Sequence, residues 1–562
     1  MILIGTVYLF RTNDQHVMWE QRYNPTGHWW FSTLFAALPV AVLLGGMALL
    51  HLKAHIAATL GLMTALLVAT GVFHMPIRMA LTTAAYGGGY GLFPICWIIL
   101  PVIFLYQLTV RTGQFESLQK SLTNITPDSR LQLLLIAFAF GAFIEGAAGF
   151  GTPVAVCGAI LISLGFRPLQ AAGLSLIANT APVAFGALGI PIVALHGVTG
   201  LDSLILAKTV SRILAPFCVL VPFWVVWAFS GFRSMIEVWP AILVAGMTFS
   251  IAQLVIAAFL GPMLVAILSS MMTIIVLIAF LKIWKPKRIL DSHCIDITGL
   301  VPKKYPHTVG TAFKAWLPWI TLSVLIFVWG LPQFSEFLNV HSTIKITVAG
   351  LHNLVWRVQP VVPAPVAEAA IYTVNWLAAT GTAILLASIV AGLTMGVRPM
   401  AMLKEFLKTI VSIRFTIITI VAMLAIGFIT RYCGLDATLG LAFARTGVMY
   451  PFFGTLIGWV GTATTGSDTS SNVLFGSLQT ITAHQIGVPA HLMASANSAG
   501  GVMGKMIDAQ SIVVASTATQ NYGQEGSILR FVFFHSLALA CLVGVLVLLM
   551  AYVHPFMSMV AK

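Results

Sequence analysis

Long intervals without a single charged residue dominate this sequence and restrict what it can fold into. They run over 23–52, 54–77, 79–110, 131–144, 146–166, 168–201, 213–232, 238–281, 315–335, 369–397, 415–430, 446–467, 469–504 and 531–561. A helix that crosses a bilayer needs about 20 mostly apolar residues, so most of these intervals are long enough for a span. Gly261-Pro262 divides the interval 238–281 into two spans, and the many Gly, Pro, Ser and Asn residues of 168–201 and 469–504 indicate broken helices. We therefore predict an all-α polytopic membrane protein with about 12–14 transmembrane segments, some of them broken or re-entrant.

The composition supports this fold class and excludes others. Only 8% of the residues are charged and 59% are hydrophobic, whereas soluble proteins have about 25% charged residues. Such a chain cannot cover a water-facing surface, which excludes a soluble enzyme. The net charge of +13 is spread along the sequence one or two residues at a time, so no nucleic-acid partner is indicated. The six cysteines have no close spacing, and we expect no disulfide framework, no metal site and no cofactor. The lipid bilayer is the partner that the composition requires.

The positions of Lys and Arg predict the orientation of the chain. The segments 285–312 and 398–408 are basic, whereas the segment 335–368 between them has nearly balanced charge. Since short cytoplasmic loops carry an excess of Lys and Arg, the two basic segments are predicted to be cytoplasmic and 335–368 external.

The same features suggest a division into two halves. We expect an N-terminal transmembrane half over 18–284, the cytoplasmic basic loop 285–312, and a C-terminal transmembrane half over 313–562. Residues 1–17 contain charged residues after a short apolar start and do not resemble a cleavable signal peptide. We expect them to be an extension that precedes the physiological start at Met18. The sequence carries no signal for an oligomeric state.

A short internal repeat places polar residues at similar positions in the two halves. Residues 178–186 and 496–504 both fit the pattern A-N-[ST]-A-x-x-x-x-G. Upstream of the first lies Glu145, which opens a glycine-rich stretch, and upstream of the second lies Asp468, within a hydroxyl-rich stretch. The order and the spacing of the two features match, which predicts structurally repeated halves of the kind found in many transporters.

These motifs predict a binding site near the middle of the membrane. Gly and Pro at membrane depth leave backbone N–H and C=O groups that lipid cannot satisfy, so such segments must face protein or a polar cavity. Helix N-termini in broken segments attract anions, while free carbonyls suit a cation. The polar and glycine residues that we expect at this site are Gly146, Gly149, Gly151, Asn179, Thr180, Ser467, Thr469, Ser470, Asn472, Asn497, Ser498 and Lys505.

The charged residues in these motifs have two interpretations each. Intramembrane ionisable residues usually serve function, yet Glu145 also fits a helix-end carboxylate at the membrane interface and Asp468 an external polar loop. Lys505 either attracts a carboxylate substrate or pairs with Asp508. Because dry surroundings favour a neutral carboxyl group, Glu145 and Asp468 are our candidates for carrying a proton.

At these same residues the chain resembles the L-lactate permease family, which includes glycolate permeases. The likeness extends from about Met18 to the C-terminus. Its most specific stretches are Gly141–Pro153 (GAFIEGAAGFGTP), Ala171–Pro191 (AAGLSLIANTAPVAFGALGIP), Thr465–Asn472 (TGSDTSSN), Phe475–Gln479 (FGSLQ) and Gly500–Met506 (GGVMGKM). The resemblance implies proton symport of L-lactate and related 2-hydroxy monocarboxylates, such as glycolate and D-lactate, across the bacterial inner membrane.

The chain departs from the usual family pattern at a few positions. The family usually has Ala in place of Thr152, apolar residues in place of Ala463 and Thr464, and a Ser-Pro pair in place of Asp508-Ala509. Glu145, Asp468 and Lys505 match the family, so these three, and not Asp508, are the charged residues that the resemblance implies at the site.

The expected mechanism is uptake of a small hydroxy-acid anion together with a proton. Helix N–H groups and Lys505 would hold the carboxylate, and the Asn, Ser and Thr side chains would read the 2-hydroxyl. Sodium coupling is an alternative, because free carbonyls and hydroxyls also suit Na⁺, and a passive anion channel is a second alternative. A membrane-embedded enzyme is not expected, since no H-E-x-x-H or paired acidic motif occurs.

Overall fold

The computed structural model describes residues 18–561 except 49, 51, 118–124, 148, 150, 299–308, 363 and 522–523. The predicted extension 1–17 and part of the predicted loop 285–312 therefore lie outside the described residues.

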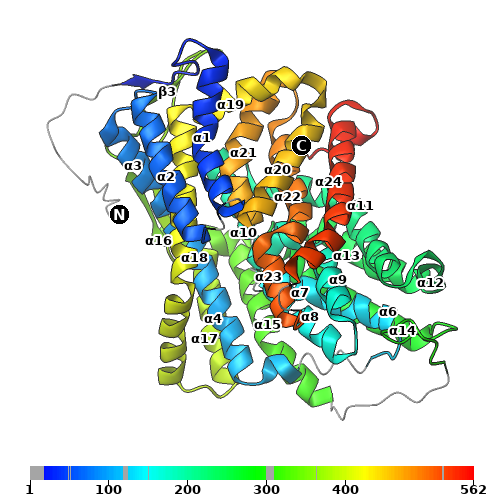
Figure 1. The fold of residues 1–562 in the computed structure, drawn as a ribbon. Helices are drawn as coiled ribbons and strands as arrows, with labels where there is room; N and C mark the ends of the chain where they lie inside the picture. Colours follow the sequence, from blue (N-terminus) through cyan, green and yellow to red (C-terminus); the bar gives the residue numbers. More distant parts are fainter. Residues whose placement is uncertain are drawn as a thin grey trace.

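Helices long and apolar enough to cross a membrane make up most of the fold (Figure 1). Within the described ranges there are seven: Ile77–Arg111, Ser129–Ala147, Ser203–Ser230, Trp239–Phe259, Val265–Ile283, Pro399–Cys433 and Glu525–Tyr552. Two further candidate spans are helix pairs bent by 65° and 76°, namely Pro168–Ala178 with Val183–Thr199 and Lys314–Trp329 with Gln333–Ser342. Shorter apolar helices are Trp29–Leu43, His55–Gly71, Thr152–Ser163 and Thr380–Thr394. The structure confirms a polytopic helical fold with broken helices.

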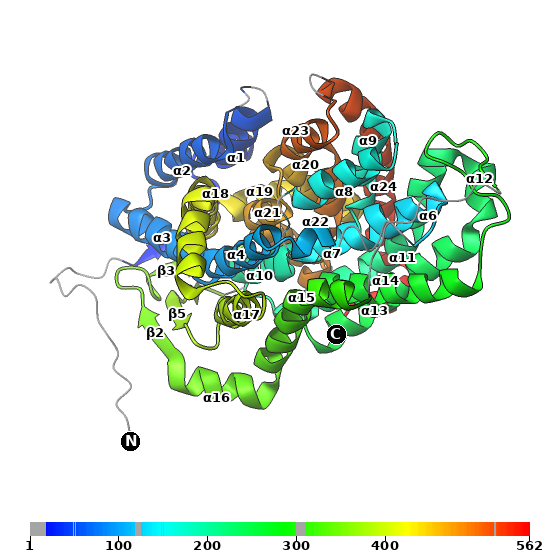
Figure 2. The same cartoon turned by 90° about the horizontal axis from the view of Figure 1, so that it is seen from below.

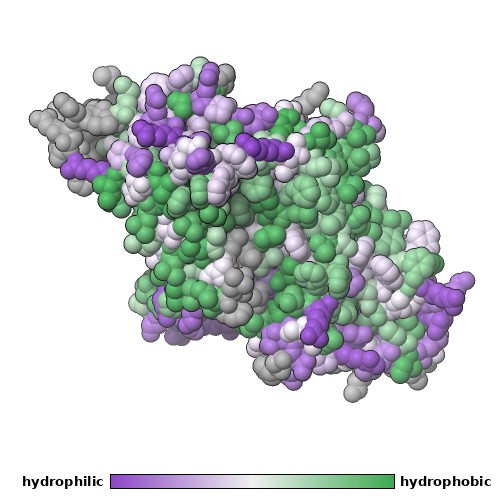
Figure 3. Space-filling view, turned by 45° about the horizontal axis from the view of Figure 1, so that its top comes forward, coloured by the Kyte–Doolittle hydropathy of each residue, from purple (hydrophilic) through white to green (hydrophobic). Residues whose placement is uncertain are grey.

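The surface has the pattern of a protein surrounded by lipid. In Figure 3 apolar residues cover the middle of the visible face, and hydrophilic residues gather toward its two opposite ends. Large apolar side chains such as Leu67, Ile275 and Phe534 are more than 60% exposed. Contiguous exposed apolar area of this kind marks a surface that does not face water.

The predicted external segment 335–368 contains regular structure that the sequence analysis missed. After α16 (Pro332–Ser342), strand β2 (Thr343–Thr347) pairs antiparallel with β5 (Ile371–Asn375). Strand β3 (Val355–Arg357) lies between β1 (Trp19–Glu20), to which it is parallel, and β4 (Val366–Ala367), to which it is antiparallel. These strands of two to five residues are too short to show alternation in the sequence, and they leave the predicted helical fold class unchanged.

Described parts of the two basic segments, 285–298 and 398–408, lie at one end of the molecule. Figure 1 shows the end of α14 (Val265–Ile283) and the turn between α17 (Thr380–Thr394) and α18 (Pro399–Cys433) at the lower end, with β3 at the upper end. That this end is the cytoplasmic one stays a prediction from the Lys and Arg content.

Two units of the same design carry the motifs. The first consists of α7 (Gly141–Ala147), α8 (Thr152–Ser163), α9 (Pro168–Ala178), η3 (Val183–Phe185), α10 (Gly186–Thr199) and α11 (Ser203–Ser230). The second consists of α20 (Tyr450–Thr465), α21 (Asp468–Ile486), α22 (Ala490–Gly504), η5 (Lys505–Ile507), α23 (Ala509–Ala518) and α24 (Glu525–Tyr552). In each unit a helix ends in a break, a hairpin of two helices follows, and a second break precedes two further helices. The interval 469–504, which we expected to be a broken helix, is this hairpin in the second unit, with its turn around Gly487.

The two units brace each other reciprocally. Helix α10 packs against α21, and its counterpart α23 packs against α8. In the same way α11 packs against α22, and α24 packs against α9. Figures 1 and 2 show α10, α21 and α22 near the centre of the molecule. Each broken segment is thereby enclosed by helices of the other unit, which meets the requirement that unpaired backbone at membrane depth be buried in protein.

The remaining helices surround this centre. Helix α18 packs against α2 (Ala54–Gly71) and α3 (Ile77–Tyr90), and α17 packs against α4 (Trp97–Arg111). On the other side α13 (Trp239–Phe259) and α14 form a pair that is separated at the predicted Gly261-Pro262 break.

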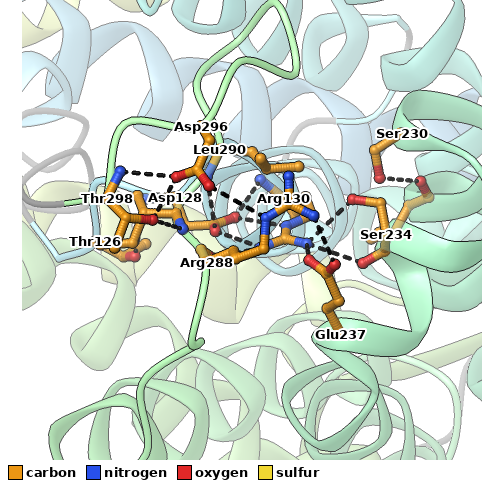
Figure 4. Close-up of polar contacts among 12 residues, drawn as sticks. Thr126, Asp128, Arg130, Ser230, Ser234, Glu237, Arg288, Leu290, Asp296 and Thr298 are labelled. Atoms are coloured by element: carbon orange, nitrogen blue, oxygen red, sulfur yellow. Dashed lines mark hydrogen bonds and ion pairs between the residues drawn. The ribbon is translucent and has the colours of Figure 1, made fainter.

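A buried ion cluster holds the start of α6 (Ser129–Leu133), which continues through η2 (Leu134–Phe140) into α7. The Arg130 side chain is fully buried and pairs with Asp128 and with Glu237, each at 2.8 Å. Arg130 also donates to the backbone oxygen of Arg288 at 2.7 Å, and Arg288 pairs with Glu237 at 3.1 Å (Figure 4). The cluster thus ties the chain that leads to Glu145 to the segment that follows α14.

Candidate functional site

The first break places Glu145 beside Asn179. Glu145 lies near the end of α7, and the chain then turns through Gly149 and Gly151, whose φ angles of 57° and 81° are left-handed. Asn179, which ends α9, donates from Nδ2 to Oε2 of Glu145 at 3.1 Å. A Cβ atom on Gly186 would lie 2.5 Å from Oε1 of Glu145, so only glycine leaves room for the carboxylate there. Glu145 is 4% exposed, so its carboxylate lies inside the protein and not at an exposed helix end.

The second break places Asp468 against the hairpin of its own unit. Asp468 is the first residue of α21, and Oγ of Ser467 caps that helix by accepting from the N–H of Ser470 at 3.3 Å. Ser498 Oγ on α22 donates to Oδ2 of Asp468 at 2.6 Å. A Cβ atom on Gly501 would lie 2.1 Å from Oδ1 of Asp468. Asp468 is 3% exposed, so its interpretation as part of an external loop is wrong.

An amide network joins the two units. Asn472 donates from Nδ2 to the carbonyl of Pro191 on α10 at 3.2 Å and to Asp468 at 3.4 Å. Asn497 donates to Oδ1 of Asn472 at 3.0 Å and accepts from Gln479 at 3.2 Å. Asn472 therefore satisfies a carbonyl in the broken segment of the other unit while it also contacts the carboxylate.

The backbone beside this network is unwound. Ala187, Leu188 and Gly189 at the start of α10 have φ angles of 43°, 59° and 73°. The left-handed region is strained for residues other than Gly, and such strain clusters at functional sites. The regular geometry of α10 is thus interrupted where it lines the space beside Glu145.

A small cavity of about 40 Å³ lies between the two breaks. The first unit contributes Glu145, Gly149, Val183, Gly186, Ala187, Ile190 and Pro191, and the second contributes Gly466, Ser467, Asp468, Thr469 and Lys505. The two motifs, far apart in the sequence, therefore meet at one place as their Gly, Ser and carboxylate content suggested.

The expected site residues divide into three groups by their position. Those that line the cavity are Glu145, Gly149, Ser467, Asp468, Thr469 and Lys505. Those that support the lining through hydrogen bonds are Asn179, Ser470, Asn472, Asn497 and Ser498. Those that serve the local packing are Gly146, Gly151 and Thr180: Gly146 faces Ala266 and Ile267, Gly151 faces Val514, and Thr180 donates to the carbonyl of Ile177.

The sequence analysis missed two kinds of residue at this place. Gly186 and Ala187 belong to a quoted motif, yet nothing in their type shows that they face a carboxylate. Gln479 and Tyr450 extend the amide network, with the Tyr450 hydroxyl donating to Oε1 of Gln479 at 2.9 Å. A Gln within the long charge-free interval 469–504 is the sequence signal that points to Gln479.

Lys505 is the cation among the residues that line the cavity. Its Nζ donates to the carbonyl of Gly466 at 2.6 Å and pairs with Oδ2 of Asp508 at 3.2 Å. Of the two interpretations from the sequence, pairing with Asp508 is the one that this structure shows, while Lys505 also remains at the cavity wall. Across the described residues, no group of three or more His, Cys, Asp or Glu side chains has an arrangement that could hold a metal ion.

Comparison with known proteins adds a family to this geometry. A family model described as L-lactate permease matches residues 32–554. The chain is 44% identical over 550 residues to an L-lactate permease of Salmonella typhimurium, covering 96% of this chain and 99% of that protein. It is 43% identical over 554 residues to the glycolate permease GlcA of Escherichia coli, again covering 96% and 99%. It is 40% identical over 565 residues to an L-lactate permease of Bacillus subtilis, covering 96% of this chain and all of that protein.

Proposed function

This chain belongs to the L-lactate permease family, and from that premise we propose that it imports L-lactate and related 2-hydroxy monocarboxylates by proton symport. It is a multi-pass protein of the bacterial inner membrane. The observation that carries the proposal is the cavity in which Glu145, Asp468 and Lys505 meet between two broken helices.

The cavity offers the groups that a hydroxy-acid anion needs. The Lys505 ammonium at the cavity wall attracts the carboxylate, and the left-handed turn at Ala187 lines the same cavity. Ser467 and Thr469 supply hydroxyls at the cavity wall for the substrate 2-hydroxyl. Asn179, Asn472 and Ser498 hold the two carboxylates in place from behind.

The size of the cavity bears on the transport cycle. A volume of about 40 Å³ has room for only about three water-sized probes, whereas ligand pockets usually measure about 300–1,000 Å³. A substrate therefore enters only when the two units separate slightly, which fits a carrier that alternates between open and closed states rather than a continuous pore.

The buried carboxylates support coupling to protons. An ionised side chain at membrane depth costs about 3 kcal/mol on insertion scales, and Glu145 and Asp468 have only hydrogen-bond donors as direct partners in the described structure. A proton on either group removes its charge before the site crosses the membrane. A carrier that takes up one proton with one substrate anion moves no net charge.

Purified protein in proteoliposomes tests the proposal. Uptake of L-lactate should saturate, should follow an imposed pH gradient and should be abolished by a protonophore. Competition by D-lactate, glycolate and pyruvate then defines the substrate class. Uptake that follows a sodium gradient at fixed pH would replace proton coupling by sodium coupling, and uptake without saturation would indicate a channel.

A further inference from the structure

Lys505 and Asp508 form a closed pair at the edge of the cavity. Lys505 is 6% exposed and Asp508 is fully buried. Oδ2 of Asp508 lies 3.2 Å from Nζ of Lys505, while its Oδ1 accepts from the N–H of Ser511 at 2.7 Å and so caps α23. The two oxygens of Asp508 therefore have different roles. Oδ1 caps helix α23, and Oδ2 pairs with the Lys505 ammonium.

Other charged groups near the pair come from the cavity. Glu145 on α7 and Asp468 on α21 line the same cavity as Lys505, and both interact electrostatically with its ammonium group. Beside Asp508 itself, a Cβ atom on Gly466 would lie 3.1 Å from Oδ1 of Asp508 and 3.3 Å from Oε1 of Gln510.

The elements packed against η5 and α23 add few titratable groups. Helix α24 carries the titratable residues Glu525, Arg530, His535, Cys541 and Tyr552. Glu525 accepts from Ser516, and His535 accepts from Trp224. Helix α8 carries Cys157, which donates to the carbonyl of Ile136. Helix α20 carries Tyr450, bonded to Gln479, and α22 carries His491, while α9 contains no titratable side chain. Among the described residues, Lys505 is thus the direct cationic partner of Asp508.

A substrate carboxylate that approaches Lys505 meets a lysine that already holds a carboxylate. Two anions around one ammonium, with Glu145 and Asp468 nearby, would leave an uncompensated charge in a dry site, which is strongly unfavourable. A neutral carboxylic acid at Asp508 removes this conflict, since its Oδ1 can still accept from Ser511 while the ammonium is left for another anion.

We propose that Asp508 is an internal counter-ion that takes the place of the substrate carboxylate in the empty site, and that a proton on Asp508 releases Lys505 to the substrate. The inference deepens the proposed function and rests on it. The proton enters the Asp508 carboxylate and the substrate anion pairs with the Lys505 ammonium, so the site gains one proton and one anion and its net charge is unchanged. Asp508 is then a positioning residue that couples proton uptake to substrate binding.

The test is the pH dependence of KM for L-lactate uptake in proteoliposomes. The variants are Asp508→Asn and Asp508→Ser, both of which keep a side chain that caps a helix N-terminus. The matched control is Asp202→Asn, because Asp202 caps α11 by accepting from Ile205 at 2.9 Å but is exposed and does not line the cavity. Thermal unfolding of each purified variant in detergent reports folding.

A variant that no longer couples a proton at Asp508 should differ from the parent protein in how log KM changes with pH. If binding requires a proton on Asp508, log KM of the parent protein rises more steeply with pH than that of either Asp508 variant, by up to one unit per pH unit, or about tenfold. At alkaline pH the Asp508 variants should therefore have the lower KM. The control should follow the parent protein.

Two results would overturn the inference. An unchanged pH slope in a folded Asp508 variant would leave the residue with a capping role only. If neither variant folds, the purified parent protein must take up one proton per lactate bound when binding is measured in two buffers of different ionisation enthalpy. Binding without proton uptake would refute the idea. Absence of lactate uptake by the parent protein is a different result, since it rejects the proposed function itself.

Discussion

Alanine at position 186 would test whether the placement of Glu145 governs transport. Gly186 has φ −62° and ψ 154°, which alanine adopts without strain, so the substitution acts through the new Cβ atom. That atom would lie 2.5 Å from Oε1 of Glu145, whereas ordinary contact begins at 3.4 Å, and the carboxylate must retreat by about 0.9 Å. The retreat disturbs the 3.1 Å hydrogen bond from Asn179.

The expected consequence is a large loss of transport in a folded protein. Displacement of a reacting group by about 1 Å can reduce a rate by about a hundredfold, so we expect the initial rate of L-lactate uptake under a pH gradient to fall by up to about that factor in Gly186→Ala. Gly45→Ala is the matched control, since Gly45 in α1 (Trp29–Ala48) has no neighbour within 4 Å of the new Cβ. The thermal midpoint of each variant reports folding. A folded Gly186→Ala protein that transports at the parent rate would show that the position of Glu145 is not critical.

Further substitutions address the proton carrier and the buried ion cluster. Glu145→Gln keeps the size and the acceptor oxygen but cannot ionise; it should abolish accumulation against a gradient while exchange of labelled for unlabelled substrate persists, and a mutant that still concentrates lactate would exclude Glu145 as the carrier. Asp468→Asn in the same assay tests the competing assignment. Arg130→Ala leaves Asp128 buried without its partner and should lower stability by about 3–5 kcal/mol, whereas Arg288→Ala, at an exposed side chain, should cost about 1 kcal/mol or less. The midpoints of thermal unfolding in detergent compare the two, and equal midpoints would contradict the calculation.

The parts of the site that could be predicted are those where a charged or polar residue lies within an apolar, membrane-spanning interval. Glu145 and Asp468 stand out because a carboxylate in an apolar interval needs a reason, and Asn179 and Asn497 because they recur in a repeated motif. The free-energy cost of placing a charged side chain in the membrane is what marks Glu145 and Asp468 in the sequence. Their convergence on one cavity follows from the same argument, since unwound segments in lipid must find each other or other protein.

The parts that could not be predicted depend on geometry that residue type does not encode. Ala187 and Leu188 adopt left-handed φ angles although neither residue favours them. The burial of Arg130 depends on Glu237 and on the Arg288 backbone, which are both distant in sequence. The pairing of Lys505 remained one of two interpretations until its distance to Asp508 was known.

The reciprocal bracing of α10 by α21 and of α23 by α8 means that neither repeat is a self-sufficient folding unit. If the polypeptide were cut between the halves and each piece were made alone, each would present a bare, unwound stretch of main chain to the hydrocarbon, with nothing to receive its hydrogen bonds. Only co-assembly of both pieces would bury these main-chain groups again. The two repeated units therefore depend on each other in the membrane, and the cavity that both of them line lies at the contact between them.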